Sequence, residues 1–170
     1  MDLRLYHNSH EFYYRSSFGA VPSGSRLILR LRASGSDAQN CRARIRLWQI
    51  NVGESFVPMS YEDGIFTGIV TIPPKGCLLW YYFIIDDGHR TFYYGNNYDR
   101  LGGEGAKYPD VPPAYQVTVY DKDAHTPDWF KHAIVYQLFP DRFRPGTHTS
   151  GRLYGKTGAV SPSDWDAVAF

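Results

Sequence analysis

The 170-residue sequence lacks several features that would point to a partner or a compartment. Its formal net charge is only +1, so charge gives no reason to expect binding to nucleic acid or to an anionic membrane. No apolar run approaches the length of a transmembrane helix. The N-terminal residues Met1–Leu5 have neither the basic region nor the apolar stretch of a signal peptide. We therefore expect a cytoplasmic protein.

Cysteine is scarce, with two residues in the whole chain. Cys41 and Cys77 lie in separate predicted strands and match no metal-ligand spacing. The six histidines form no ligand spacing on a recognisable helix or hairpin either. We expect two buried thiols, with a disulfide left open, and no cofactor.

Aromatic residues are abundant by contrast, with 14 Tyr, 10 Phe and 4 Trp. Such residues suit the pleated, half-buried surface of a β-sheet, and sandwich cores are built from them. Flat rings can also stack on the apolar faces of pyranose sugars. The composition thus leaves two interpretations open, a β-rich core and a sugar-binding surface.

From residue 26 to residue 121 the sequence predicts short strands separated by turns, without helical periodicity. Strands of this length and spacing are typical of a sandwich or barrel rather than of alternating βαβ units. Asp63-Gly64 and Asp87-Gly88 lie between apolar runs and predict tight hairpin turns. We therefore expect an all-β fold. The predicted strands are Leu27–Ala33, Arg42–Ile50, Phe56–Tyr61, Ile65–Ile72, Leu78–Asp86, Thr91–Tyr94 and Ala114–Tyr120.

One predicted strand, Leu78–Ile85, is apolar on both faces instead of alternating. A strand of this kind has to be covered on both sides, by the second sheet and by something else. The cover could be a catalytic domain, a partner subunit or a ligand.

The composition changes after residue 121. Residues 124–132 are polar and predict a linker, and Ala133–Phe139 predicts a buried strand outside the hairpin pattern. The remainder is rich in Gly, Ser, Thr and Pro and is not expected to form a core of its own. We accordingly divide the chain into residues 1–123, 124–132 and 133–170.

The segment Thr126–Phe143 (TPDWFKHAIVYQLFPDRF) is the most informative part of the sequence. It resembles the first barrel strand of the neopullulanase, cyclomaltodextrinase and maltogenic amylase group of the α-amylase family. Upstream, Leu29–Ala33, Leu79–Phe83 and Tyr115–Asp121 are similar to the N-terminal immunoglobulin-like domain of that group. The motif residues to which the resemblance gives a structural role are Tyr136, Gln137, Pro140, Asp141, Arg142 and Phe143.

The resemblance implies an immunoglobulin-like β-sandwich at residues 1–123, followed by the truncated start of a (β/α)8 barrel. Many relatives carry an Asn/Asp cluster for calcium after the motif, where this chain has Arg144-Pro145-Gly146-Thr147. No calcium site is therefore expected here. The catalytic carboxylates of the family lie on later barrel strands, and retaining hydrolysis needs two of them about 5–5.5 Å apart. No residue of this chain is assigned a catalytic role.

Two functions remain open at this stage. In the first, the sandwich is an accessory domain of an α-glucan-hydrolysing enzyme and packs on its own catalytic barrel or on a second subunit of a homodimer. In the second, it is a carbohydrate-binding module that contacts α-glucan through exposed rings. The candidate rings are Trp48, Tyr93 and Tyr94.

Overall fold

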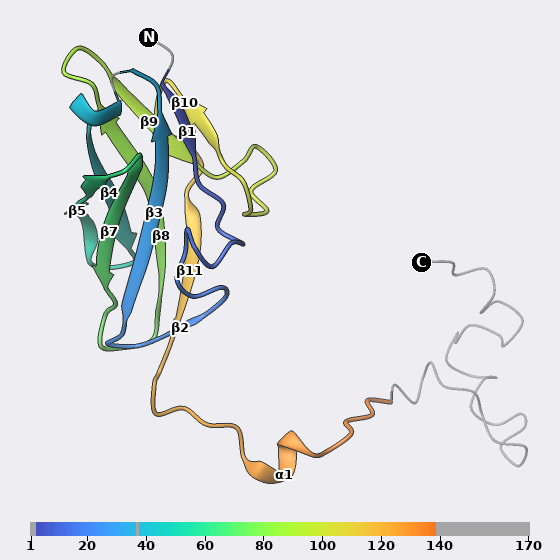
Figure 1. Cartoon of the computed structure of the whole chain (residues 1–170). Helices are drawn as coiled ribbons and strands as arrows, with labels where there is room; N and C mark the ends of the chain where they lie inside the picture. The colour runs from blue at the N-terminus through green and yellow to red at the C-terminus, as the bar shows by residue number, and fades with distance from the viewer. Residues whose placement is uncertain (1–2, 37, 139–170) are drawn as a thin grey trace, which may run out of the picture. The chain divides into compact units, whose positions relative to one another are not determined.

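The structure is a computed structural model that describes residues 3–36 and 38–138 (Figure 1). The chain divides into two compact units, Met1–His125 and Thr126–Phe170. The first unit is built almost wholly from β-strands. The described part of the second unit contains one short helix.

The smaller of two sheets in the first unit is antiparallel and has the strand order β1-β3-β7-β6. Its long central pair, β3 and β7, is visible along the front of the unit in Figure 1. The strands are β1 (Arg4–Tyr6), β3 (Arg26–Ser34), β6 (Ser60–Glu62) and β7 (Ile65–Thr71).

The larger sheet is organised around β8. Along one edge β8 pairs with β4, which in turn pairs with β5. Along the other edge the N-terminal half of β8 pairs with β11 and the C-terminal half with β9, so the sheet forks. The outer strand β2 runs parallel to β11, and β10 pairs with β9. These strands are β2 (Val21–Pro22), β4 (Arg42–Gln49), β5 (Gly53–Pro58), β8 (Cys77–Asp86), β9 (Thr91–Gly95), β10 (Ala106–Tyr108) and β11 (Tyr115–Tyr120).

One hydrophobic core lies between the inner faces of the two sheets, as in a β-sandwich. Alternation along β3 buries Leu27, Leu29 and Leu31, and alternation along β4 buries Ile45 and its inward neighbours. The sheets approach closely at Gly68, where an added Cβ would lie 2.5 Å from the Ile45 Cδ1 atom. The structure therefore confirms the all-β prediction.

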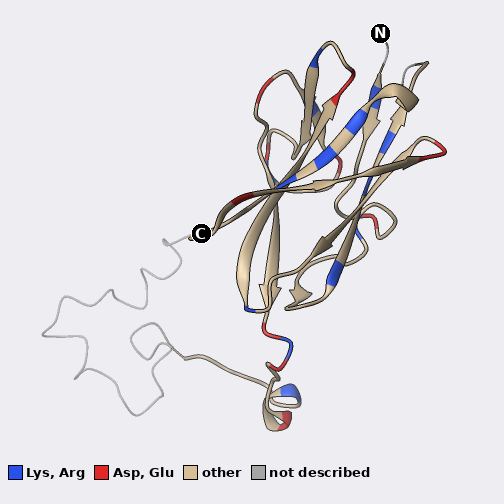
Figure 2. Cartoon of the chain, turned by 90° about the vertical axis from the view of Figure 1, so that its left-hand side faces the viewer, with Lys and Arg blue, Asp and Glu red and all other residues tan. Residues whose placement is uncertain are grey.

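The burial pattern of β4 gives the strand one solvent-facing side. Arg42 and Arg44 are exposed and Arg46 is half-buried, all on the outer face of the larger sheet. Figure 2 shows basic residues along strands of this unit and acidic residues mostly at turns and loops.

All seven predicted strands are present, although Phe56–Tyr61 is two strands rather than one. The Met59 N–H donates to the Ala43 carbonyl at 3.0 Å, which ends the pairing of β5 with β4. The chain then crosses to the smaller sheet as β6. Sequence analysis missed β1, β2 and β10, because strands of two or three residues carry no readable alternation.

The doubly apolar strand β8 is covered on its inner face by the core. On its outer face, Tyr82 and Ile84 are also buried. The Arg46 guanidinium lies 5.2 Å from the centroid of the Tyr82 ring, and the Tyr93 ring centroid lies 6.1 Å from it. Side chains of neighbouring strands in the same sheet thus cover part of the outer apolar face of β8.

The predicted hairpin turn at Asp63-Gly64 is confirmed, with φ values of 47° and 81° at the two residues. This left-handed pair is the geometry that suits the twist of the flanking strands. At the second turn, Gly88 has a φ of 86°, and the Asp87 carboxylate accepts the N–H groups of His89 and Arg90. Those hydrogen bonds hold the pKa of Asp87 below its usual value.

In the second unit the prediction of a strand at Ala133–Phe139 is wrong over its described residues. Residues 133–138 have no strand geometry and are all exposed. Within residues 3–36 and 38–138 no segment pairs with them, and a strand without a neighbour cannot form a ladder. The predicted linker contains a helical turn, α1 (Asp128–Lys131). Tyr136 is exposed and Gln137 lies beside it, whereas Pro140, Asp141, Arg142 and Phe143 lie outside the described residues.

Cys41 and Cys77 are not joined by a disulfide. Cys41 is buried as predicted, and Cys77 is only partly buried. Among the described residues, no helix has the length and apolar character needed to cross a membrane.

Candidate functional site

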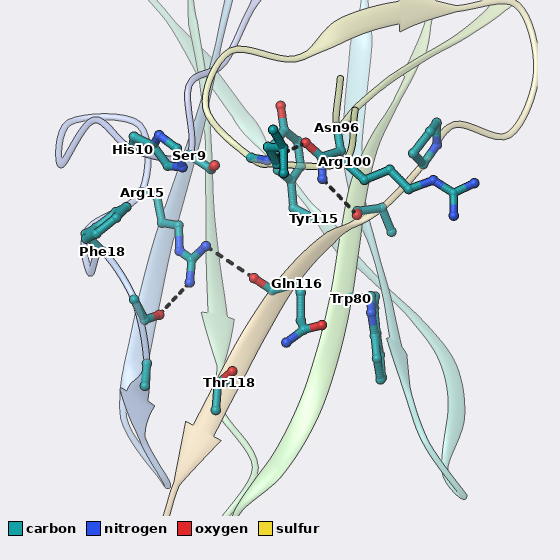
Figure 3. A pocket seen from close by; sticks show the side chains of 16 residues that line it. Ser9, His10, Arg15, Phe18, Trp80, Asn96, Arg100, Tyr115, Gln116 and Thr118 are labelled. Atoms are coloured by element: carbon teal, nitrogen blue, oxygen red, sulfur yellow. Dashed lines mark hydrogen bonds between the residues drawn. The ribbon is translucent and has the colours of Figure 1, made fainter. Parts of the chain in front are cut away.

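A pocket of about 530 Å³ lies against the outer faces of β8 and β11 (Figure 3). We call it the β11 pocket. It is enclosed by the loop of residues 9–20, by the loop of residues 96–102 and by the two strands. The lining side chains labelled in Figure 3 are Ser9, His10, Arg15, Phe18, Trp80, Asn96, Arg100, Tyr115, Gln116 and Thr118.

Trp80 reaches this pocket because alternation on β8 turns it away from the core. In the register of the sheet Trp80 lies opposite Gln116 on β11 and opposite Trp48 on β4. The Trp48 and Trp80 ring centroids are 5.1 Å apart, with an angle of 56° between the ring planes. The three side chains form a continuous row across three strands, which we call the Trp row.

Arg15 fixes the loop of residues 9–20 to the sheet. Its Nη2 donates to the Gly19 carbonyl at 2.7 Å and its Nη1 to the Gln116 carbonyl at 3.3 Å, as Figure 3 shows. The side chain is buried, its Nε has no partner, and no carboxylate among the described residues pairs with it. Phe18 at the tip of this loop is exposed, and its ring lies edge-on to His10 at 5.3 Å.

The opposite wall, residues 96–103, is held by backbone and side-chain hydrogen bonds, both to Ser9 and within the segment. The Ser9 N–H donates to the Gly103 carbonyl at 2.9 Å, and the Ser9 hydroxyl accepts the Gly103 N–H at 2.9 Å. Asn96 accepts the Gly102 N–H at 3.0 Å. Gly102 has a φ of 77°, and an added Cβ there would lie 2.9 Å from the His10 Nε2 atom. The wall is therefore close-packed against the His10 loop.

Beneath the pocket lies a fully buried polar cluster around His7, which we call the His7 cluster. The His7 Nδ1–H donates to the Arg30 carbonyl at 2.7 Å, because a carbonyl can only accept. Nε2 is then unprotonated and accepts from the Tyr81 hydroxyl at 3.0 Å. The His7 N–H also donates to the Tyr94 hydroxyl at 3.1 Å. The other aromatic member is Tyr115.

Burial keeps every titratable member of the His7 cluster neutral. It lowers the pKa of His7 to about 4 and raises the pKa of Tyr94 to about 12. Burial likewise raises the pKa values of Tyr81 and Tyr115. A neutral, buried cluster of this kind anchors the N-terminal segment to both sheets, and its member Tyr115 also lines the floor of the β11 pocket.

The lining of the β11 pocket combines aromatic rings with neutral and basic polar side chains. Among the described residues no aspartate or glutamate lines it, so it offers no carboxylate pair for glycoside hydrolysis. The part of the chain that the structure describes also contains no group of three or more His, Cys, Asp or Glu side chains arranged for a metal ion.

The structure separates the three aromatic residues that sequence analysis had grouped as exposed rings. Trp48 is half-buried and packs on Trp80. Tyr93 is half-buried on the same face but packs on Tyr82. For Tyr94 the expectation of an exposed ring is wrong, since it is buried and bound to His7. Consecutive residues of a strand point to opposite faces, so Tyr93 and Tyr94 cannot share one surface.

Sequence analysis did not identify Trp80, Phe18 or Gln116 as site residues. Trp80 was recognised only as part of a strand face in need of cover. The pairing of β4 with β8 would have been the signal, because it sets two tryptophans side by side on one face of the sheet.

No protein-family model matches the chain. It is 39% identical over 153 residues to an amylopullulanase of Thermoanaerobacterium thermosulfurigenes, covering 84% of this chain and 8% of that protein. It is 39% identical over 176 residues to an amylopullulanase of Thermoanaerobacterium saccharolyticum, covering 95% and 13%. It is 35% identical over 174 residues to an amylopullulanase of Thermoanaerobacter thermohydrosulfuricus, covering 96% and 11%.

The chain is homologous to a segment of amylopullulanases. This finding supports a relationship to the glycoside hydrolases and agrees with the α-amylase-family resemblance of the Thr126–Phe143 motif. The chain spans only 8–13% of the length of these curated relatives. An alignment over 95% of the chain runs through both of its units.

Proposed function

We propose that this chain is the N-terminal accessory region of a larger enzyme that hydrolyses α-glucan, with an immunoglobulin-like sandwich at residues 1–123. The observation that carries the proposal is the homology to amylopullulanases over 84–96% of the chain. The all-β first unit and its carboxylate-free pocket support a role other than catalysis.

In this proposal the catalytic carboxylates lie on a barrel that begins near residue 133, and the fragment alone is inactive. The sandwich packs on that barrel or on a second copy in a homodimer. Such a contact would bury apolar side chains that are exposed on the two loops beside the β11 pocket. They are Phe12, Tyr98 and Leu101.

Three finer points stay predictions. The first is a particular kinship with the neopullulanase, cyclomaltodextrinase and maltogenic amylase group, which rests on the Thr126–Phe143 motif. The second is the expectation that no calcium is bound, which rests on Arg144–Thr147. The third is a cytoplasmic location.

The test is a reducing-sugar assay of the 170-residue chain on starch, pullulan, maltodextrin and cyclodextrin, with an amylopullulanase as the positive control. We expect no product above the buffer blank. Turnover that disappears when a single Asp or Glu of this chain is replaced would show that the chain is itself a hydrolase.

The second candidate function is binding of α-glucan by the sandwich. The Trp row favours it, because a pair of half-exposed indole rings beside an amide is the chemistry that holds sugars. The two candidates are compatible, since an accessory domain can both pack on a barrel and hold the substrate.

A further inference from the structure

The β11 pocket combines an aromatic wall on each side with polar groups between them (Figure 3). Phe18 lies on one side, Trp80 on the other, and Gln116 and Thr118 project between them from β11. We propose that this pocket binds an α-linked glucan, with Trp80 and Phe18 flanking one glucose unit and Gln116 bonding its hydroxyls. The proposal rests on the proposed function, which makes α-glucan the polymer that the parent enzyme acts on.

The polar groups at the site are free to bind a ligand. Within residues 3–36 and 38–138, the side chains of Gln116, Thr118 and Arg100 make no hydrogen bond to the protein. A sugar hydroxyl both donates and accepts, and an amide can meet both needs at once. The cavity volume of about 530 Å³ lies in the ordinary range of small-ligand sites, roughly 300–1,000 Å³.

The angle between the two indole rings favours an α-linked chain. Trp48 extends the site beyond the pocket, and its ring plane is turned by 56° from that of Trp80. A β-linked glucan is a flat ribbon whose sugar faces lie in one plane. Successive sugars of an α-linked glucan turn relative to one another, so such a chain can follow two tilted rings.

An anionic ligand fits the pocket less well, although two arginines line it. Both Nη atoms of Arg15 already donate to backbone carbonyls, at 2.7 and 3.3 Å. Figure 3 shows the Arg100 guanidinium directed away from Arg15, on the other side of the pocket. Two cations that do not converge offer no clamp for a carboxylate or phosphate.

The binding elements are fixed before any ligand arrives, which lowers the ordering cost of binding. Trp80 is held by its strand and by contact with Trp48. Arg15 ties the Phe18 loop to the backbone of Gln116. The two walls and the floor of the site are therefore connected by direct contacts.

The test is calorimetric titration of the 170-residue chain with maltoheptaose and, in parallel, with cellohexaose. We expect binding of maltoheptaose and little or none of cellohexaose. Trp80→Ala and Phe18→Ala should each weaken maltoheptaose binding at least about tenfold, as losses of aromatic anchors do. Gln116→Ala should weaken it roughly fivefold through the lost hydrogen bonds.

The matched control is Phe12→Ala, on the same loop as Phe18, exposed and outside the pocket lining. It should change the affinity by less than about twofold. Phe18 and Gln116 are exposed, so their variants keep the proposal testable even if Trp80→Ala fails to fold. Circular dichroism of each variant checks the fold.

Two outcomes overturn the proposal in different ways. Absence of maltoheptaose binding, or binding that Phe18→Ala and Gln116→Ala leave intact, removes the site but not the accessory role. Binding of cellohexaose alone, lost on Phe18→Ala, keeps the pocket but contradicts α-glucan as the polymer and with it the proposed function.

Discussion

The Trp row and the His7 cluster lie on opposite faces of β8 and are built from similar materials. Each joins aromatic rings to a planar nitrogen-bearing side chain, Gln116 in the row and His7 in the cluster. In the cluster His7 is fully buried and both ring nitrogens are hydrogen-bonded. In the row Gln116 is exposed and its amide is unbonded within the described residues.

This difference teaches how to separate a structural aromatic cluster from a candidate binding surface. Polar groups whose bonds are all satisfied inside the protein stabilise the fold, because breaking them leaves buried groups without partners. Polar groups beside exposed rings with unmet bonds contribute little to stability and are available to a ligand. The comparison predicts opposite responses to mutation on the two sides of one strand.

The largest expected effect is loss of the His7 cluster. His7→Ala leaves the Tyr81 hydroxyl and the Arg30 carbonyl without partners in the core and opens a cavity. We expect the free energy of unfolding to fall by about 4 kcal/mol, measured by urea denaturation. His10→Ala, at an exposed histidine, should change it by less than about 0.5 kcal/mol. Similar losses for both variants would remove the distinction between cluster and surface.

The second effect is a dependence of stability on pH. The pKa of His7 is about 4 in the folded protein, against about 6.5 for an unfolded histidine. A lowered folded pKa means that the contribution of His7 is complete above pH 6.5 and is lost as the pH falls towards 4. The loss attributable to His7 should reach about 3 kcal/mol.

Nuclear magnetic resonance titration of the His7 ring measures this pKa directly, and urea denaturation between pH 7 and pH 4 measures the stability. If the folded-state pKa of the His7 ring is near 4, protonation of His7 accounts for the fall in the free energy of unfolding between pH 7 and pH 4. A His7 ring that titrates near its unperturbed value would contradict the burial argument.

A third prediction concerns the pocket wall. Gly102→Ala and Gly24→Ala each put a side chain on a left-handed backbone, with φ values of 77° and 71°, and each should cost about 1 kcal/mol. Only the Cβ at position 102 crowds His10, since nothing lies within 4 Å of the one at position 24. We therefore expect weaker maltoheptaose binding for Gly102→Ala alone. Equal affinities of the two variants would show that the wall does not shape the site.

The smallest expected effect on stability belongs to the Trp row. Gln116→Ala removes an exposed side chain without partners and should change the free energy of unfolding by less than about 0.5 kcal/mol. The same substitution should weaken maltoheptaose binding roughly fivefold. A thermal melt and a titration on one preparation measure both quantities. A clear loss of stability would place Gln116 with the structural residues instead.

Much of the sandwich could be predicted because strand alternation and turn chemistry are local. The strand predicted at Arg42–Ile50, observed as Arg42–Gln49, and the Asp63-Gly64 turn each followed from a few neighbouring residues. The prediction for Ala133–Phe139 failed because its apolar pattern is the same for a paired strand and for an exposed segment. Pairing decides between them, and pairing is not a local property.

Only part of the candidate site could be predicted from the sequence. Trp48 was identified as a candidate ring, and it does lie in the Trp row. Tyr94 was grouped with it because the sequence gives no absolute orientation to a strand whose residues are mostly apolar. The structure turns Tyr94 inward to His7, a residue far away in the chain.

By itself the sequence determined the longer strands of the first unit and the tight turn at Asp63-Gly64, because these follow from the sterics and alternation of adjacent residues. Its motif after Thr126 also carried the resemblance to the α-amylase family. The tertiary structure alone decided that Trp48 meets Trp80 and that Arg15 reaches the backbone of Gln116. Strand register and loop packing bring those residues together, and they minimise the free energy of the whole core rather than of any one segment.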